Sequence, residues 1–447
     1  MTRRAKPAPS VFFRTLGCPK NQVDSEVMLA QLALGGYVIA ERIEDADLAV
    51  LNTCSFIESA RKESIDTIFE LAQHKETGQL KHLVVSGCLP QRYGAELAKE
   101  LPEVDAFIGT GEFPKIAEIL DETRAGRSRG VYVDAGRTHL HDGDTPRMLI
   151  GGGHSAYLKV AEGCDRVCAF CAIPAIRGKF QSRSVESIVA EAHSLAEQGA
   201  RELCIVSQDT LSFGKDRQGR PAPEQLITGL DQVEVDWVRL LYLYPSAIQA
   251  PLLDAWASAK RVLRYIDVPL QHGSDRVLRA MKRGVTAERQ RRLVETLRER
   301  LPGATLRTTF IVGFPGETDA DFEELLAFVR DVRFDRVGVF RYSDEKETSA
   351  KDLPDKVPAR VSLARQRELQ RVQKEIMRER LAPLVGQELQ VLVDSGSGGF
   401  SVGRIWSQAP EVDGQTLLRG PAERGQMVRA RITRVKGVDL EAQVIDA

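Results

Sequence analysis

Cysteine is scarce in this chain, with seven residues in 447. An odd number at so low a density excludes the disulfide framework of a small secreted protein. An excess of charge of one sign is also lacking, because 62 Lys and Arg residues face 63 Asp and Glu residues. A net charge of −1 gives no whole-molecule attraction toward nucleic acid or membrane surfaces. The positions of the seven cysteines therefore become the main clue to function.

Long apolar runs are missing as well. No stretch approaches the roughly 18 apolar residues that a membrane span requires. Near the N-terminus, the run Val11–Phe13 ends at Arg14, which leaves no apolar segment of a signal peptide. We therefore expect a cytoplasmic protein without membrane association. Thiols stay reduced in that compartment, so clustered cysteines are expected to be metal ligands or catalytic groups.

Length and composition fit a globular chain of about three domains. Residues 8–130 alternate apolar runs with amphipathic stretches, which predicts an α/β domain with a doubly wound parallel sheet. Residues 131–153 are polar and rich in Gly and Asp, as in a linker or surface excursion. Residues 154–380 hold six further βα units and predict a partial (βα)6 barrel, ending in a charge-rich helix at 360–380. Residues 381–447 predict a small all-β, OB-like barrel.

Three cysteines, Cys164, Cys168 and Cys171, have the spacing C-x3-C-x2-C. They follow the first predicted strand of the central domain, Tyr157–Ala161, so they lie on the loop that leaves it. Three thiolates can hold three corners of a 4Fe-4S cube and leave one iron open. The alternative is a structural zinc site, but zinc usually takes four protein ligands. The nearest histidine, His154, lies on the wrong side of the strand.

Cys18, Cys54 and Cys88 each follow a predicted strand of the first domain. The four strands expected there are Ser10–Leu16, Asp47–Leu51, Lys81–Ser86 and Asp105–Ile108. The ends of parallel strands share one rim of the sheet, where ligands bind. We therefore predict a second cluster with three Cys ligands. The alternative, three buried apolar thiols, would leave their equivalent positions unexplained; it does suit the seventh residue, Cys204, which lies inside an apolar run.

Two glycines, Gly17 and Gly87, each precede a cysteine of this second set. Glycine lets the backbone approach closely, here to a bulky inorganic group.

The spacing of Cys164, Cys168 and Cys171 after the first strand of a barrel resembles the radical S-adenosylmethionine superfamily, as does Phe170 before the last cysteine. The resemblance implies that S-adenosylmethionine chelates the open iron. An electron from the cluster then splits the sulfonium to give a 5′-deoxyadenosyl radical.

Over essentially its whole length, the chain resembles the methylthiotransferase family. The matching motifs are Leu16-Gly-Cys-Pro-Lys-Asn, Asn52-Thr-Cys-Ser-Phe-Ile, Ser86-Gly-Cys-Leu and Cys168-Ala-Phe-Cys-Ala-Ile-Pro-Ala-Ile-Arg-Gly. The resemblance implies two 4Fe-4S clusters, S-adenosylmethionine as cofactor and methyl donor, and a C-terminal TRAM domain. It also implies external donors of electrons and sulfur. We expect a monomer.

One branch of this family modifies adenosine in tRNA, and the other modifies the β-carbon of an aspartate in small-subunit ribosomal protein twelve. The tRNA branch would carry Gly-Cys-Gln-Met-Asn where this chain has Gly17-Cys-Pro-Lys-Asn, and Gly-Gln-Asn where it has Ser207-Gln-Asp-Thr. Residues 381–447 hold eight acidic and seven basic residues. That balance is weak for holding RNA phosphates and suits docking of a basic protein. We therefore expect the ribosomal-protein branch.

Other candidate site residues lie at strand ends. Gly313 and Glu317 belong to Phe310-Ile-Val-Gly-Phe-Pro-Gly-Glu, which resembles the element that packs on adenine in the superfamily; an ordinary Pro-Gly turn is the alternative. Predicted contacts of cofactor or substrate at the barrel mouth are Gln208, Asp209, Gln271 and His272, unless they are only satisfied polar strand ends.

Four charged residues and a tyrosine stay open. Arg177 and Arg183 either pair with a carboxylate or order the cysteine loop. Asp24 and Glu26 are expected at a helix start. Tyr342 either reaches the cavity or packs.

Three competing functions remain. A tRNA adenosine methylthiotransferase would use the same scaffold. An iron–sulfur electron carrier would want closed clusters, which two sets of three cysteines do not favour. A passive RNA-binding protein using the C-terminal barrel would leave both cysteine sets without a role.

Overall fold

Strands and amphipathic helices alternate through the first two thirds of the computed structural model, and its residues fall into two units. The structure describes residues 8–127, 130–134, 139–397 and 399–446. Residues 1–7, which carry the basic start of the chain, and residues 135–138 of the predicted linker lie outside the described residues. The first unit contains Met1–Gly151, Ala161–Arg166 and Ala172–Gln181, and the second contains Gly152–Val160, Val167–Cys171 and Ser182–Ala447.

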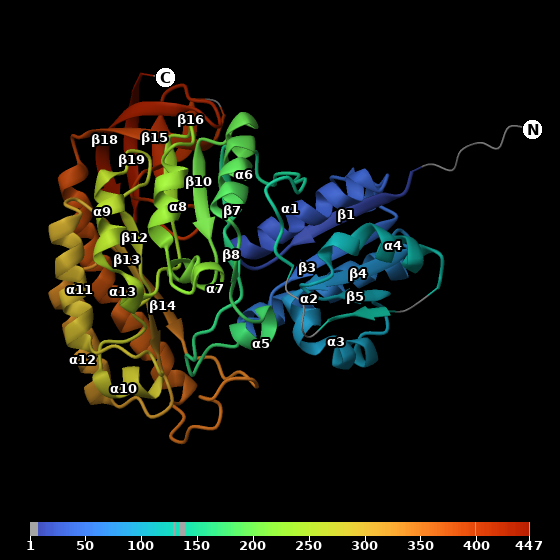
Figure 1. Cartoon of the computed structure of the whole chain (residues 1–447), viewed down its shortest axis with the longest axis horizontal. Coiled ribbons are helices and arrows are strands. Elements are labelled where there is room, and N and C mark those ends of the chain that lie inside the picture. The colour runs from blue at the N-terminus through green and yellow to red at the C-terminus, as the bar shows by residue number, and fades with distance from the viewer. Residues whose placement is uncertain (1–7, 128–129, 135–138, 398, 447) are drawn as a thin grey trace, which may run out of the picture. The chain divides into compact units, whose positions relative to one another are not determined.

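A six-stranded, all-parallel sheet forms the centre of the first unit, in the order β2-β1-β3-β4-β5-β6 (Figure 1). Its strands are β1 (Ser10–Thr15), β2 (Val38–Ala40), β3 (Leu48–Thr53), β4 (His82–Gly87), β5 (Ala106–Ile108) and β6 (Gly130–Tyr132). The helices are α1 (Pro19–Leu34), α2 (Glu58–Glu76), α3 (Cys88–Glu100) and α4 (Ile116–Arg124), with 3-10 turns η1 (Ile43–Asp45) and η2 (Phe113–Lys115).

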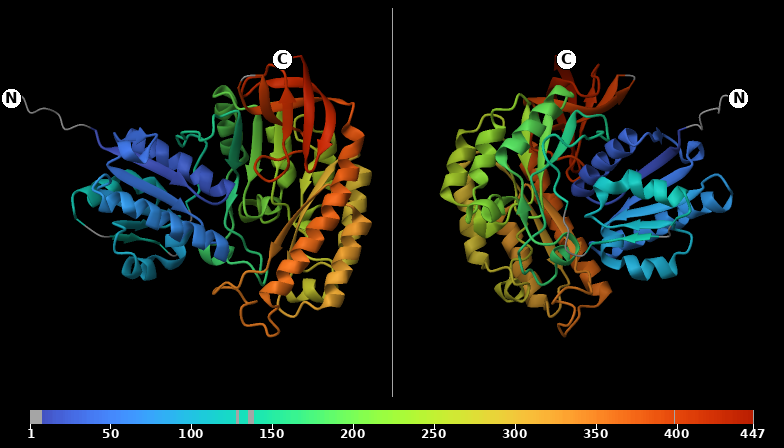
Figure 2. Two further views of the ribbon diagram at one scale, coloured as in Figure 1. Left: turned by 180° about the vertical axis from the view of Figure 1, so that it is seen from behind. Right: turned by 45° about the vertical axis from the view of Figure 1, so that its right-hand side comes forward.

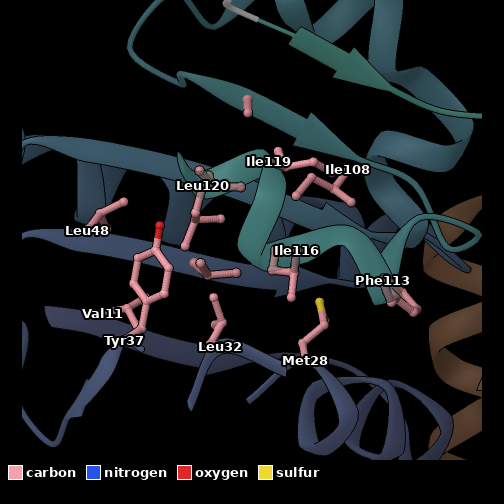
Figure 3. Close-up of a cluster of buried hydrophobic side chains, with 13 residues drawn as sticks. Val11, Met28, Leu32, Tyr37, Leu48, Ile108, Phe113, Ile116, Ile119 and Leu120 are labelled. Atoms are coloured by element: carbon pink, nitrogen blue, oxygen red, sulfur yellow. The ribbon is translucent and has the colours of Figure 1, made fainter. Parts of the chain in front are cut away.

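Helices cover both faces of this sheet, because successive side chains of one strand enter two different cores. Leu48 of β3 packs with Met28 and Leu32 of α1 and with Ile116 of α4 (Figure 3). The next residue, Ala49, packs in a second core with side chains of α2 and α3. This arrangement confirms the predicted doubly wound sheet.

The sequence analysis predicted neither of the two edge strands. β2 and β6 are three residues each, and their side chains are at most half-buried, so neither leaves an apolar run in the sequence. The last two residues of β6, Val131 and Tyr132, and the residues after them up to 153 fall in the predicted linker. Met148 N donates to Glu26 O at 3.0 Å and Ile150 N donates to Glu26 Oε1 at 3.1 Å, so this stretch contacts α1. The predicted domain boundaries stay a prediction.

Six parallel strands form the barrel region of the second unit. They make two sheets, β11-β10-β7 and β12-β13-β14, and a parallel bridge from Val238 to Val262 links the strand β11 to the chain entering β12. The strands are β7 (Ser155–Lys159), β10 (Glu202–Val206), β11 (Trp237–Leu240), β12 (Tyr265–Asp267), β13 (Thr305–Val312) and β14 (Arg336–Arg341). The predicted partial (βα)6 barrel is thereby confirmed.

Helices connect these strands, as a parallel sheet requires. They are α6 (Val185–Glu197), α7 (Lys215–Gln218), α8 (Pro223–Leu230), α9 (Ala250–Ser258), α10 (Asp275–Ala280), α11 (Ala287–Arg300), α12 (Asp319–Val332) and the expected long helix α13 (Ala359–Leu381). Shorter elements are η3 (Thr210–Ser212), η4 (Pro245–Ala247) and η5 (Ala382–Leu384). Around the cysteine loop lie β8 (Ala161–Glu162), α5 (Ile173–Arg177) and β9 (Gln181–Ser182). In the described ranges, no helix is both long and apolar enough to cross a membrane.

The C-terminal part of the chain, red in Figure 2, forms a small barrel. Its five strands close in the order β15-β16-β17-β19-β18. They are β15 (Glu388–Ser397), β16 (Phe400–Ile405), β17 (Thr416–Arg419), β18 (Met427–Lys436) and β19 (Asp439–Asp446). Alternate residues such as Val428, Ala430 and Ile432 point into one apolar core. The predicted all-β, OB-like barrel is confirmed.

A buried ionic network joins this barrel to the strand starts of the central region. Glu202, the first residue of β10, accepts from Arg239 of β11 at 3.0 Å and from Arg404 of β16 at 2.6 Å. Arg404 also pairs with Asp394, whose other partner is His154 at 3.0 Å. The small barrel therefore packs under the amino ends of the strands. Loops lie at the opposite, carboxyl ends of these strands, where chemistry is expected.

Candidate active site

Cys18, Cys54 and Cys88 come together at one rim of the first unit's sheet. Cys18 precedes α1 as its N-cap, Cys54 directly follows β3, and Cys88 is the first residue of α3. Burial and the neighbouring thiols Cys88 and Cys18 raise the pKa of Cys54 to about 12, and burial also raises the pKa of Cys88. Each of these thiols is therefore close enough to the others to influence their ionisation. Their role as cluster ligands stays a prediction.

Gly17 provides the room in which the cysteines meet. Its φ is +96°, and a Cβ added there would lie 2.7 Å from Cys54 Cβ and 3.3 Å from Cys54 Sγ. At Gly87, φ is +99° and an added Cβ would lie 2.6 Å from Thr53 O. Both glycines permit a close approach, but to neighbouring protein atoms.

Asparagine side chains hold the chain segments that carry the cysteines, which the sequence analysis did not foresee. Asn21 Nδ2 donates to Leu16 O at 3.1 Å and to Thr53 O at 2.9 Å. Asn52 Nδ2 donates to Asn21 O at 2.9 Å and to Ser25 Oγ at 2.8 Å. Both asparagines are fully buried. Both asparagines belong to the cysteine motifs quoted above, and this was the signal in the sequence that could have identified them.

Arg177, at the end of α5, reaches this cysteine set within the first unit. Its Nη2 donates to Cys88 Sγ at 3.2 Å, and its Nη1 pairs with Asp24 at 2.7 Å and with Glu162 at 3.2 Å. Burial would lower the pKa of this guanidinium, but Cys88, Glu162 and Asp24 hold that pKa well above its ordinary value. Arg177 therefore both pairs with carboxylates and contacts a predicted cluster ligand.

Asp24 and Glu26 do not lie at a helix start, and that expectation was wrong. α1 begins at Pro19, and its first turn carries no acidic residue. Both side chains are buried: Asp24 pairs with Arg177, and Glu26 pairs with Arg147 at 2.5 Å. The proline after Cys18 starts the helix earlier than the acidic residues suggested.

The second cysteine set lies on one loop. Cys164 belongs to the first unit, where its N donates to Gly178 O at 3.1 Å and its Sγ accepts from Arg166 N at 3.4 Å. Cys168 and Cys171 belong to the second unit and are joined by a turn, with Cys171 N donating to Cys168 O at 3.1 Å.

No three Cys, His, Asp or Glu side chains in the described part of the chain lie close enough to hold a single metal ion. In a 4Fe-4S cube each cysteine binds a different iron, so the cysteines need not converge on one point. The finding therefore applies to sites for a single metal ion.

Arg283 is a contact of this loop that the sequence analysis missed. Its Nη1 donates to Cys168 Sγ at 3.3 Å, its Nη2 donates to Pro269 O at 2.7 Å, and its guanidinium stacks 4.3 Å above the ring of Tyr244. The preceding residue, Lys282, has a φ of +56°. Such a backbone conformation is costly for a residue with a side chain and often marks a functional turn.

Backbone hydrogen bonds fix the middle of the loop. Ala169 N donates to Met281 O at 3.0 Å, and Ala169 O accepts from Ala350 N at 2.9 Å. Phe170 is partly buried against an apolar cluster that includes Met281 and Phe314. Tyr342 packs there too, edge-on to Phe314 at 5.3 Å, which is the packing alternative expected for it.

Gln208, Asp209, Gln271 and His272 follow strands of the central region. Asp209 is buried and accepts from Ser212 Oγ at 2.7 Å. Gln271 is nearly buried and has a φ of +76°. His272 Nδ1 accepts from Ser274 N at 3.0 Å, which leaves the ring proton of the neutral form on Nε2, 3.6 Å from Glu317 Oε2. Their contact with cofactor or substrate stays a prediction.

Glu317 closes the loop that begins at Gly313. It accepts from Gly313 N at 2.8 Å, Phe314 N at 3.2 Å and Arg365 Nη1 at 2.8 Å. Gly313 has a φ of +75°, and an added Cβ would collide with Ser362. These contacts show how the loop is held, and binding of adenine there stays a prediction.

Arg183 and Cys204 make contacts that serve the structure of the central region. Arg183 is buried and pairs with Glu191, and its Nη1 donates to Lys159 O at 2.9 Å. Cys204 is fully buried, and burial raises its pKa. The reading of Cys204 as a core thiol is confirmed.

Comparisons with known proteins agree with this anatomy. Three family profiles match: Uncharacterized protein family UPF0004 over residues 10–109, the Radical SAM superfamily over 158–329 and the TRAM domain over 385–445. Among solved structures, the methyltransferase TsrM from Kitasatospora setae aligns with a TM-score of 0.56 at 17% identity, over 77% of each chain. The cobalamin-dependent enzyme OxsB aligns with 0.54 at 15% identity, over 82% of this chain and 56% of that one. At such identities the two structures show the fold alone.

Two curated relatives match nearly end to end. The ribosomal protein uS12 methylthiotransferase RimO of Myxococcus xanthus (strain DK1622) is 46% identical over 441 residues, covering 98% of this chain and 92% of that protein. The protein of the same name from Symbiobacterium thermophilum (strain DSM 24528 / JCM 14929 / IAM 14863 / T) is 47% identical over 438 residues, covering 96% and 90%. With this identity over nearly the whole length of both proteins, the chain belongs to the RimO family of radical S-adenosylmethionine methylthiotransferases.

Proposed function

We propose that this chain is an enzyme that adds a methylthio group to the β-carbon of an aspartate in ribosomal protein uS12. The observation that carries the proposal is the near end-to-end similarity to the RimO proteins. The meeting of Cys18, Cys54 and Cys88 on a domain separate from the radical S-adenosylmethionine profile supports it, because the reaction needs a sulfur site besides the radical site.

The residues fit the cofactors of this family, two 4Fe-4S clusters and S-adenosylmethionine. Thiols are the donors that iron–sulfur clusters take, and each set offers three. Cys164, Cys168 and Cys171 would hold the cluster that binds S-adenosylmethionine. Cys18, Cys54 and Cys88 would hold the second cluster. When bound, these groups supply a radical able to break an unactivated C–H bond, and a methylated sulfur.

The chain's own residues would orient the loop that carries Cys168 and Cys171. Arg283 donates an N–H to Cys168 and so fixes the direction of its sulfur. Phe170 packs into the apolar cluster around Phe314 and so restrains the loop that carries Cys168 and Cys171. Phe310–Val312, at the end of β13, lead into the loop held by Glu317.

The charge pattern of the C-terminal barrel favours a protein substrate over tRNA. The exposed arginines of β18 are matched by carboxylates: Arg429 Nε donates to Glu388 at 3.0 Å, Arg431 donates to the same carboxylate at 2.6 Å, and Arg434 pairs with Glu441 at 3.0 Å. Affinity for RNA phosphates scales with the cations available to them. A paired stripe offers few, so a basic ribosomal protein is the more suitable partner.

Modification of a ribosomal protein places the enzyme where ribosomal subunits are made or used, so we propose that it acts in the cytoplasm. It depends on external donors of electrons and sulfur. The expected monomeric state stays a prediction.

Anaerobic reconstitution tests the proposal. The full chain, supplied with iron, sulfide, S-adenosylmethionine and a reductant, is incubated with uS12 or with tRNA, and both substrates are analysed by mass spectrometry. We expect a methylthio addition on one aspartate of uS12 and formation of 5′-deoxyadenosine. A methylthio group on tRNA adenosine alone would contradict the choice of substrate. The same incubation with Cys164, Cys168 and Cys171 all replaced by Ala is the control and should form no 5′-deoxyadenosine.

A further inference from the structure

We propose that Arg177 is a positioning residue for the cluster held by Cys18, Cys54 and Cys88, donating an N–H to Cys88 and supplying a fixed positive charge beside it. This inference rests on the proposed function, because it concerns the cluster that would present sulfur. It goes further by assigning a residue from outside the UPF0004 profile, which ends at residue 109, to the environment of that cluster.

The contact geometry is specific. Arg177 Nη2 lies 3.2 Å from Cys88 Sγ and also donates to Asn21 Oδ1, the side chain that braces Leu16 and Thr53 beside the two other cysteines. The whole guanidinium is buried, with 3% of the residue exposed. Without nearby water, an N–H aimed at sulfur is stronger and is screened less than at the surface.

Two carboxylates fix the orientation of this guanidinium. Asp24 of α1 accepts from Nη1 at 2.7 Å, and Glu162 of β8 accepts from the same nitrogen at 3.2 Å. Both carboxylates are buried. Because the guanidinium is planar and its donors are rigidly placed, anchoring Nη1 directs Nη2 toward Cys88. The contact is therefore a built feature of the fold.

The contact between Arg177 and Cys88 is also linked to the other cysteine set through the chain itself. α5, which ends in Arg177, begins at Ile173, two residues after Cys171. The short segment that leaves the radical cysteine loop therefore delivers its arginine to the other cysteine set. Any shift of that segment would change the hydrogen bond at Cys88.

Chemically, the arginine should raise the reduction potential of the cluster. Reduction adds negative charge, and hydrogen bonds to the cysteine sulfurs together with nearby cations favour the more negative state. Asp24 and Glu162 oppose this effect, so removing Arg177 would leave two buried carboxylates beside three thiolates. A purely structural ion pair would predict no change in potential once the protein is folded.

The test isolates one cluster. In the full chain, replacing Cys164, Cys168 and Cys171 by Ala leaves the N-terminal set as the expected iron site. Into this background go Arg177→Met, Arg177→Lys and, as the matched control, Arg183→Met. Arg183 is equally buried and pairs with a carboxylate, and none of its described hydrogen bonds goes to sulfur. Each reconstituted protein is followed by iron content, electron paramagnetic resonance of the reduced state and redox titration.

We expect Arg177→Met to shift the midpoint potential to a more negative value and to release iron several-fold faster to a chelator. Arg177→Lys should recover part of the shift, because it keeps the charge without the fork of donors. Arg183→Met should leave the potential unchanged. A folded Arg177→Met protein with the potential and iron release of the background would overturn the proposal.

A second variant is needed in case Arg177→Met does not fold, because this substitution leaves buried carboxylates unpaired. The double variant Arg177→Met with Asp24→Asn relieves part of that burden and should show the same direction of shift; an unchanged potential in it would equally overturn the inference. If the background protein carries no cluster at all, the proposed function fails instead, so the two failures are distinguishable.

Discussion

At the scale of single residues, the two cysteine sets should separate into two chemical tasks. Replacing Cys18, Cys54 or Cys88 by Ala is expected to abolish methylthio transfer while 5′-deoxyadenosine still forms, because the radical site stays intact. Replacing Cys168 by Ala should abolish both products. The measurement is liquid chromatography of 5′-deoxyadenosine beside mass spectrometry of uS12.

Cys204→Ala is the control for these variants, since Cys204 is a fully buried thiol of β10 beside the ionic network of Glu202, Arg239 and Arg404. It should form both products. Loss of 5′-deoxyadenosine in Cys54→Ala would show that the two sites are not separable.

Arg283 gives a second prediction at this scale. Residues that orient metal ligands typically contribute about 10–100-fold to affinity or activity. Arg283→Met should therefore slow 5′-deoxyadenosine formation by about tenfold or more, because Cys168 loses an N–H donor that is 3.3 Å away. Arg283→Lys should recover part of the rate. A rate within twofold of the unaltered protein in Arg283→Met would contradict this role.

At the scale of elements, the junction between β4 and α3 depends on a glycine. Gly87 and Gly78 both have positive φ, +99° and +79°, but an added Cβ meets the β3 backbone only at the first of them and has open space at the second. Gly78→Ala should cost about 1–2 kcal/mol of unfolding free energy from backbone strain. Gly87→Ala should cost more and should also reduce iron binding, because Cys88 moves with the helix start.

Urea denaturation and iron analysis of these two variants measure the effects side by side. Equal losses in both would mean that only the backbone conformation, and not the contact with Thr53, matters at Gly87.

Apolar runs in the sequence predicted the buried strands. They predicted β3 and β4, which are almost wholly buried, and the six barrel strands, most of which are buried along much of their length. β2 and β6 left no run, since an edge strand of three residues has little to bury. The start of α1 was misread because acidic residues were taken as a first-turn signal, whereas Asp24 and Glu26 serve buried arginines.

At the scale of the whole molecule, Glu202 ties the C-terminal barrel to the central strands. Burial alone would raise the pKa of Glu202, but Arg404 and Arg239 lower it below its ordinary value of 4.5. A carboxyl group whose pKa is lowered by folding stabilises the protein above its unfolded pKa, and this contribution is lost as the pH falls through the folded value. The ion pairs should therefore stabilise the interface fully at pH 7. Their contribution should begin to decline below about pH 4.5 and be lost only as the pH falls through the lower folded pKa.

Glu202→Gln should lower the free energy of unfolding by about 3–5 kcal/mol at pH 7. Arg239 and Arg404 would both lose the buried Glu202 carboxylate, and of its described ion pairs Arg404 would keep only the one with Asp394. Urea denaturation at pH 7 and pH 4 should show a smaller acid loss in this variant than in the unaltered protein. Glu295→Gln, at an exposed glutamate of α11, is the control and should follow the unaltered protein. An acid loss of the same size in Glu202→Gln would contradict the assignment.

The sequence by itself determined the three folds and both cysteine sets, because apolar periodicity and strand-end positions are local properties. It also determined the family, through motifs of a few adjacent residues. Only the tertiary structure decided which distant side chains serve those cysteines. Arg177 reaches Cys88, and Arg283 reaches Cys168, across separations of 89 and 115 residues. Such partners meet through packing of whole elements, and no local pattern encodes that meeting.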